Sequence, residues 1–296
     1  IPPGTVWQPY WEVKNNAATY WYHPHLHEMT MDQITKGIGG LIIVRDEVES
    51  KLALPRTYGV DDIPLVLTDR DFNTSNQFVA VPYGDTMMVN GTLRPQYNIP
   101  AQVIRFRILN AAIERSYNLG FSDNRTFQII TSDGGLLNAP VPVTRYLLHA
   151  GERVEILVNC GADIGKSLDL KAYNSGQTLG FPGGEPNTSG DFGSLLNNID
   201  FNVLHINVAA TTTATTPITA LPSTLISNTY WTAADATVTR AIAVTNGNPG
   251  PASVPFNFDN ITYSLTMTPK VVNLNDIEKW TVTNNAVFGH SFHLHD

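Results

Sequence analysis

Short stretches in which apolar and polar residues alternate, separated by turn residues, recur along the whole chain of 296 residues. Alternation with a period of two is typical of β-strands that bury one face, and signals for helices are almost absent. Turn pairs such as Asn90-Gly91 supply the positive φ angles that tight hairpins need. This pattern predicts an all-β chain built from sandwiches or barrels. The stretches that we expect to be strands are 19–22, 40–44, 63–68, 103–109, 127–131, 153–158 and 203–208.

Two changes of composition divide the chain. Residues 45–57 hold a cluster of charges and a proline, which indicates a linker, and residues 209–224 are a run of Thr, Ala and Pro with almost no charge, typical of an extended connector. We therefore expect the C-terminal part of a first domain, a complete middle domain, a linker and the N-terminal part of a third domain. Their expected bounds are 1–48, 58–208, 209–224 and 225–296.

Six of the eight histidines lie in two clusters, His23-Pro-His25-Leu-His27 and His290-Ser-Phe-His293-Leu-His295. A strand projects residues i and i+2 from the same face, so a His-x-His pair on a strand can direct two imidazoles at one point. His290 precedes His293 by an odd number of residues, so we expect it to point to a different place. Imidazole pairs of this kind predict copper sites.

Charge and composition exclude several classes of partner. The net charge is −8 and no cluster of Lys and Arg occurs, which argues against binding to nucleic acid or to an anionic membrane. No run of 18 apolar residues occurs, so we expect no membrane span. Cys160 is the single cysteine and has no histidine beside it, so we expect a structural role for it.

Three groups of motifs carry a resemblance to a known family. Thr19-Tyr-Trp-Tyr-His-Pro-His25 comes first, Arg105-Phe-Arg-Ile-Leu-Asn110 lies in the middle, and Gly289-His-Ser-Phe-His-Leu-His-Asp296 comes last. They resemble the second copper motif, the middle domain and the third copper motif of three-domain multicopper oxidases, in the branch of bacterial laccases, copper-efflux oxidases and bilirubin oxidases. The resemblance implies consecutive cupredoxin-like Greek-key β-sandwich domains, of which the first and the last are incomplete here.

The resemblance also implies a set of ligands for four copper ions, one of type 1, one of type 2 and two of type 3. Carried over by position, His23, His25 and His295 would bind the type 3 coppers, His293 the type 2 copper and His290 the type 1 copper. The family's first and fourth copper motifs are not among these residues. The remainder of the same polypeptide would therefore be needed to complete the copper sites.

The function that the resemblance implies is a laccase-like oxidase. It would couple one-electron oxidation of a phenol or an aromatic amine at the type 1 copper to four-electron reduction of O2 to water at a trinuclear cluster, in the periplasm or outside the cell. Asp296 is a candidate substrate contact. A cuprous oxidase for copper tolerance is an alternative, but Ala286 and Phe288 stand where that branch has its copper(I) ligands.

Other interpretations stay open beside the oxidase. The chain could be a catalytically inactive fragment, or a non-enzymatic cupredoxin-repeat protein of the cell envelope, although the retention of five expected ligand histidines speaks against the latter. His27 continues the spacing of the first cluster, but we do not expect it to be a ligand. His149 and His205 lie in apolar strand contexts, and we expect them to be structural.

Overall fold

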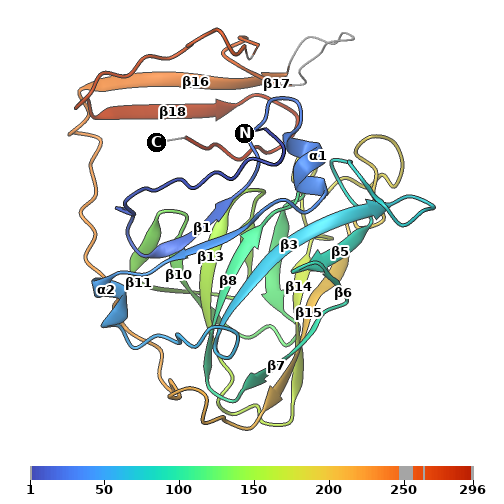
Figure 1. Ribbon diagram of the computed structural model, residues 1–296, viewed down its shortest axis with the longest axis vertical. Coiled ribbons are helices and arrows are strands. Elements are labelled where there is room, and N and C mark those ends of the chain that lie inside the picture. Colours follow the sequence, from blue (N-terminus) through green and yellow to red (C-terminus); the bar gives the residue numbers. More distant parts are fainter. Residues whose placement is uncertain (1, 247–255, 263, 295–296) are drawn as a thin grey trace.

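The computed structural model describes residues 2–246, 256–262 and 264–294, and nearly all of its regular structure is β-strand (Figure 1). The prediction of an all-β chain is therefore confirmed. Each stretch expected to be a strand is one: β1 (Ala18–Tyr22), β2 (Gly40–Val44), β3 (Asp62–Phe72), β8 (Val103–Asn110), β10 (Phe127–Ser132), β13 (Arg153–Asn159) and β15 (Asp200–Ala209).

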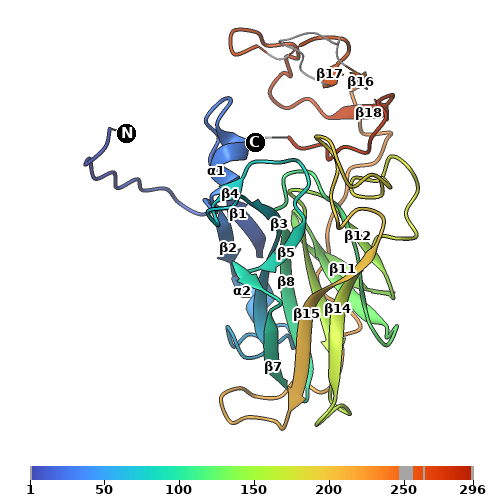
Figure 2. The same cartoon turned by 90° about the vertical axis from the view of Figure 1, so that its right-hand side faces the viewer.

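The middle of the chain forms a sandwich of two sheets (Figures 1 and 2). The larger sheet has the strand order β11-β10-β13-β8-β3-β5-β6, with β4 paired to β3, and the smaller sheet has the order β12-β9-β14-β15-β7. The remaining strands of the sandwich are β4 (Phe78–Val79), β5 (Thr86–Val89), β6 (Thr92–Leu93), β7 (Gln96–Pro100), β9 (Tyr117–Phe121), β11 (Gly135–Val143), β12 (Tyr146–Leu148) and β14 (Ser167–Tyr173).

The hairpin between β5 and β6 closes at the turn that the sequence indicated. Asn90 and Gly91 are its two central residues, with φ angles of 50° and 72°. Two consecutive positive φ angles give the turn whose twist matches that of the paired strands, and asparagine followed by glycine tolerates them best.

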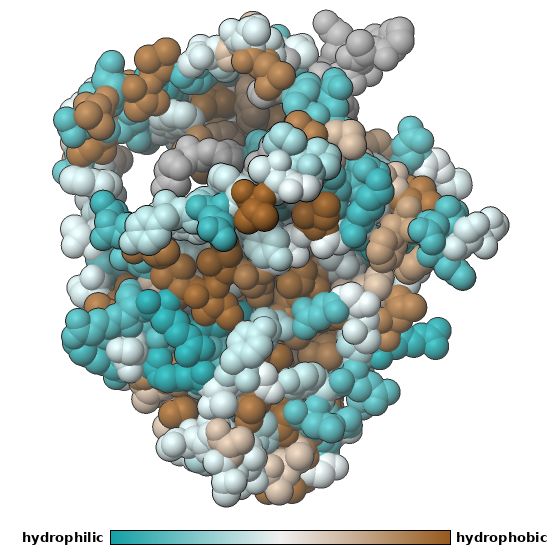
Figure 3. Space-filling view, in the orientation of Figure 1, coloured by the Kyte–Doolittle hydropathy of each residue, from teal (hydrophilic) through white to brown (hydrophobic). Residues whose placement is uncertain are grey.

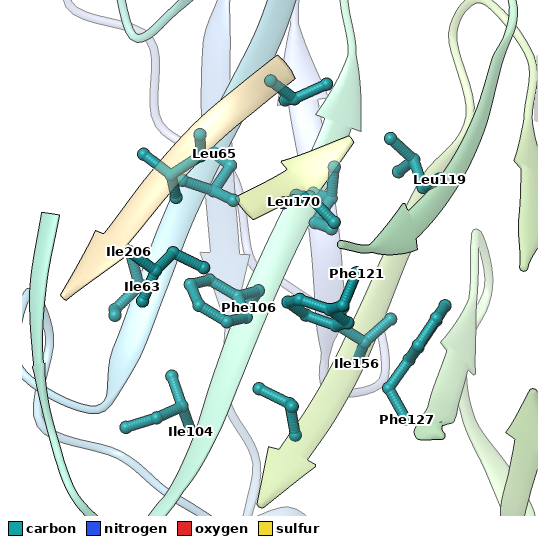
Figure 4. Close-up of a cluster of buried hydrophobic side chains, with 14 of the residues drawn as sticks. Ile63, Leu65, Ile104, Phe106, Leu119, Phe121, Phe127, Ile156, Leu170 and Ile206 are labelled. Carbon is teal, nitrogen blue, oxygen red and sulfur yellow. The ribbon is translucent and has the colours of Figure 1, made fainter. Parts of the chain in front are cut away.

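Strand β8 is buried on both faces, and all eight of its residues are inaccessible. Ile104 and Phe106 project into the hydrophobic core between the two sheets (Figure 4). The residues that alternate with them, Arg105 and Arg107, project from the opposite face of the sheet. They are buried because the first segment of the chain covers this face.

That first segment contributes an antiparallel pair of strands, β1 and β2, and two short helices, α1 (Thr30–Thr35) and α2 (Glu47–Ser50). Figure 3 shows hydrophobic residues gathered over β2 and hydrophilic residues over α2. Strand β1 lies over the larger sheet beside β13 (Figure 1). The segment therefore forms a third layer on one face of the sandwich.

A network of buried charges lies in the larger sheet under this layer, and its pair of Arg105 with Glu49 joins the layer to the sandwich. Arg105 Nη1 donates to Glu49 Oε1 over 2.6 Å, Arg107 Nε to Asp62 Oδ1 over 2.6 Å, and Arg107 Nη1 to Glu155 Oε1 over 2.7 Å. All five side chains are at most 2% exposed. The charges at this interface are paired, as buried charges must be.

The charge cluster of residues 45–57 thus does more than link two domains. Asp46 Oδ1 accepts a hydrogen bond from the backbone N–H of Glu49 over 2.7 Å and so caps helix α2 at its N-terminus. The helix carries Glu49 to the guanidinium groups of Arg105 and Arg56. The charge pattern indicated the cluster, but its partner Arg105 lies in the middle of the chain, and local sequence does not reveal this pairing.

The last part of the chain forms a three-stranded sheet, β17-β16-β18, which lies beyond one end of the sandwich (Figure 1). Residues 210–237 lead to it without helix or strand and contact the sandwich on the way. For example, Val103 N donates to Ile218 O over 2.8 Å. Among the described residues, no helix is long and apolar enough to cross a membrane. The bounds of the sheet are β16 (Val238–Asn246), β17 (Phe256–Phe258) and β18 (Glu278–Asn284).

Candidate metal centre

The first histidine cluster follows directly on strand β1, and the structure brings two of its imidazoles together. The ring centroids of His23 and His25 lie 5.7 Å apart, with the ring planes tilted by 35°. Trp21 stacks on His23, with 4.2 Å between the centroids and 29° between the planes. The stacked indole limits how far the His23 ring can rotate. The pairing predicted from the i, i+2 spacing is therefore seen in the geometry.

The hydrogen bonding of His23 suits a metal ligand. Its Nδ1 atom lies 3.0 Å from the carbonyl oxygen of Pro24. The tautomer that carries its proton on Nδ1 donates this bond, which leaves the lone pair of Nε2 available to a cation. Neutral imidazole is a good ligand for copper. The donor chemistry of this pair therefore fits copper.

The second cluster lies on residues 285–294, which follow β18 and have no strand in the described part of the chain. The strand expected for this cluster is thus wrong as far as His290 and His293 are concerned. Its backbone bonds to the sandwich instead of to a neighbouring strand, since Gly289 N donates to Gly180 O over 2.7 Å. Ser291 Oγ also donates to Ala150 O over 2.8 Å. These bonds dock the cluster on the middle domain.

His290 is an exposed residue of this segment, with one side of its ring against the protein. Its ring lies 4.2 Å from the ring of Phe256, edge to face, and burial lowers the pKa of the imidazole. The lowered pKa favours the neutral form at pH 7, which is the form that binds metals. His290, a candidate ligand, therefore lies beside the Phe256 ring with its neutral form favoured.

The two clusters approach each other in space. In both Figure 1 and Figure 2, the red chain that carries the second cluster passes beside the loop that precedes α1, where the first cluster lies. His295 and Asp296, predicted as a ligand and a substrate contact, lie outside the described residues. Within the ranges that the structure describes, no three His, Cys, Asp or Glu side chains converge on a metal position.

A cavity of about 230 Å³ lies between the docked segment and the sandwich. Its lining includes His290 and Phe288 on one side and His149 and Glu114 on the other. Burial, and then the charge of Glu185, raise the pKa of the Glu114 carboxyl. Glu114 was not predicted as a site residue, because nothing in its local sequence shows that a segment far along the chain folds against it.

The remaining histidines and the cysteine have partners of their own. His149 Nδ1 lies 2.7 Å from Ser116 Oγ, and His205 Nδ1 lies 2.7 Å from Asp169 Oδ1 on the half-exposed face of β15. Cys160 is fully buried, and burial raises the pKa of its thiol to about 11. A thiol with that pKa is protonated at pH 7 and is a poor metal ligand.

Paired imidazoles at the end of a strand, held against an all-β sandwich, define a class of copper-binding β-sandwich proteins. Comparison with known proteins makes the class specific. Residues 1–49 and residues 64–166 each match a family model described as multicopper oxidase, and together they make up slightly more than half of the chain. The chain belongs to the multicopper oxidase family, and membership of this family implies copper binding.

Curated relatives of the chain are named as cell division proteins. The chain is 39% identical over 169 residues to the cell division protein FtsP of Escherichia coli (strain K12) and 38% identical over 169 residues to that of Rahnella sp. (strain Y9602). Each match covers 54% of this chain and 35% of the relative. The chain thus matches about a third of the length of these relatives.

Solved structures with the same fold include bacterial oxidases. The McoA multicopper oxidase of the hyperthermophile Aquifex aeolicus is similar with a TM-score of 0.78 and 28% identity, over 94% of this chain and 60% of that one. The laccase-like multicopper oxidase CueO of Ochrobactrum sp. is similar with a TM-score of 0.68 and 31% identity, over 80% of this chain and 50% of that one. The cupredoxin-like fold expected from the sequence is therefore confirmed.

Proposed function

We propose that the protein is a laccase-like multicopper oxidase, which couples one-electron oxidation of phenolic or aromatic amine donors to four-electron reduction of O2 to water. The observation that carries this proposal is the pairing of His23 and His25 next to the segment that bears His290 and His293. Copper supplies the electron storage that such a reaction needs. The solved structures that are similar to this chain include a laccase-like oxidase.

Each histidine has a proposed role. His23, His25 and His295 would hold the two type 3 coppers, His293 the type 2 copper and His290 the type 1 copper, for four copper ions in the intact protein. The stacking of Trp21 on His23 supports this assignment, because it fixes a ring that must keep its direction whether or not a metal is bound.

The type 1 copper would need a thiolate, and Cys160 does not qualify because it is buried with a raised pKa. We therefore propose that the remainder of the same polypeptide supplies the thiolate and the other histidines. We also propose a periplasmic or secreted location and expect neither nucleic acid nor a membrane span among its interactions.

The proposed reductant is a small aromatic molecule. The cavity beside His290 has aromatic walls, since Phe256 and Phe288 both line it. Phe288 also packs against Phe192, with 5.5 Å between the ring centroids. These aromatic walls, and the absence of sulfur or carboxylate ligands at positions 286 and 288, favour an aromatic donor over copper(I). Asp296 remains a candidate contact for the donor.

A second candidate is a role in cell division without oxidase activity. It is favoured by the name of the relatives that are 38% and 39% identical over 169 residues. A protein with that role alone would not need the imidazole pair.

Oxygen consumption separates the two candidates. The copper-loaded full-length polypeptide is given a phenol or p-phenylenediamine, and O2 uptake is followed with an electrode. We expect one O2 consumed for four donors oxidised, and loss of uptake in His290→Ala. The control His205→Ala changes a half-exposed histidine on β15 and should keep the activity. A copper-loaded protein that consumes no O2 with any donor would refute the oxidase and favour the second candidate.

A further inference from the structure

One face of strand β1 carries a row of residues that leads to the first histidine cluster. Thr19 and Trp21 alternate along β1 and therefore lie on the same side of the strand, and His23 follows directly after its end. Trp21 and His23 are stacked, as described above. Thr19 is the buried end of this row, with an exposed fraction of 1%. The contacts of Thr19 therefore fix the buried end of β1, the strand that leads to the imidazoles.

Thr19 is held by a buried ion pair of the middle sandwich. Its hydroxyl donates to Glu155 Oε1 over 2.7 Å and accepts from Arg107 Nη1, which lies 3.1 Å away. Arg153 Nε also donates to the backbone oxygen of Thr19 over 3.2 Å. Three side chains from β8 and β13 thus converge on one residue of β1.

The ion pair is itself immobilised. Glu155 Oε2 accepts from Arg105 Nε over 2.7 Å, and Arg107 Nη2 donates to Asp62 Oδ2 over 3.1 Å. The backbone N–H of Glu155 donates to Thr131 Oγ1 over 2.9 Å. The carboxylate of Glu155 and the guanidinium of Arg107 are thus held by the sandwich independently of β1. We therefore infer that their positions determine the position of Thr19.

We propose that the Glu155–Arg107 ion pair is a positioning element for the candidate copper ligands. By holding the Thr19 hydroxyl, it fixes the direction of β1 and, through Trp21, the place of the His23 and His25 rings. The proposal rests on the proposed function in one respect, namely that this imidazole pair takes copper. Supports of this kind, behind the ligands themselves, typically change metal affinity by about 10-fold to 100-fold when removed.

The simpler interpretation is that these contacts only hold the first segment to the sandwich. A matched pair of variants in the full-length polypeptide separates the two. Thr19→Val removes the hydroxyl but keeps the branched shape, whereas Thr131→Val removes a hydroxyl that is equally buried and bonds to the same Glu155 but lies on β10. Thr19→Ser restores the hydroxyl and is the rescue variant.

The first readout needs no copper. Amide hydrogen exchange at Trp21 and Tyr22 reports how firmly β1 is held. We expect exchange about 10-fold faster in Thr19→Val, and wild-type exchange at these two amides in Thr19→Ser and Thr131→Val. Unchanged exchange in Thr19→Val, or an equal acceleration in Thr131→Val, would overturn the positioning role.

The second readout is copper(II) itself, followed by competition binding and electron paramagnetic resonance. The double variant His23→Ala/His25→Ala defines the signal that belongs to the pair. We expect Thr19→Val to weaken this binding about 10-fold and to alter its spectrum, with wild-type behaviour in Thr131→Val. Unchanged affinity and spectrum in Thr19→Val would overturn the proposal. If the double variant keeps all of the copper signal, the proposed function fails at this pair, while the exchange data still decide on positioning.

Discussion

Arg107 is a fully buried member of the charge network that lies under the first segment. Its guanidinium contacts Asp62, Glu155 and the hydroxyl of Thr19, and it is 1% exposed. Removing one member of a buried ion pair leaves an uncompensated buried charge, which is far more costly than losing an exposed pair.

We therefore predict that Arg107→Met lowers the free energy of unfolding by about 3 to 5 kcal/mol. The control is Lys51→Met, which removes an exposed ion pair with Glu47 and should change stability by less than about 1 kcal/mol. Urea unfolding followed by circular dichroism measures both. An Arg107→Met protein as stable as the control would show that the network is not a stabilising feature of the interface.

Removing the charge of Glu114 should have the opposite effect and stabilise the folded protein. Its raised pKa means that the folded protein binds the proton more tightly than the unfolded chain, so ionisation of the carboxyl reduces stability as the pH rises above the ordinary value of 4.5. Glu114→Gln should therefore raise the melting temperature at pH 7 and bring little change at pH 4. A melting temperature that falls at pH 7 would contradict this account of the cavity.

At the scale of elements, strands were predicted well and interfaces poorly. Strand β2 has the bounds expected from its apolar run, and β8 was expected from its alternation. The same alternation gives Arg105 and Arg107 a common face, but it cannot show that this face is buried. Their acidic partners come from α2, β3 and β13, and local patterns do not reveal pairs so far apart in sequence.

The strand expected around His293 failed for a similar reason. The spacing of the histidines fits a strand, but the backbone N–H of Gly289 bonds to Gly180 and the hydroxyl of Ser291 bonds to Ala150 of the middle domain instead. By contrast, the pairing of His23 and His25 needs only the strand before them, and it was predictable. Glu114 was missed because its role depends on that docking. The domain bounds and the copper ligands stay predictions.

We expect helix α2 to detach from the sandwich at acid pH. Burial by itself would raise the pKa of Glu49, but hydrogen bonds and charge from Arg105 and Arg56 lower it below the ordinary 4.5. A carboxyl with a lowered pKa stabilises the folded state above that value, and the contribution is lost as the pH falls below it. We expect faster proteolysis within residues 45–57 at pH 3.5 than at pH 7. In Glu49→Gln this difference between the two pH values should be small, and an undiminished difference would assign it to other groups.

At the scale of the whole molecule, three parts meet around the histidines. The first segment brings His23 and His25, and the last part brings His290 and His293. The sandwich holds the first segment through buried hydrogen bonds and the last part through bonds to Gly289 and Ser291. The candidate ligands thus come from parts of the chain that are remote in sequence, and both parts contact the middle domain.

The central claim is that the two histidine clusters bind copper. The most direct test is the copper content of the full-length polypeptide, measured by elemental mass spectrometry after loading and removal of free metal. The account predicts about four copper ions per molecule, with fewer in His23→Ala/His25→Ala and in His290→Ala while each variant keeps its circular dichroism spectrum. A folded protein that retains no copper, or variants that retain as much as the wild type, would contradict it.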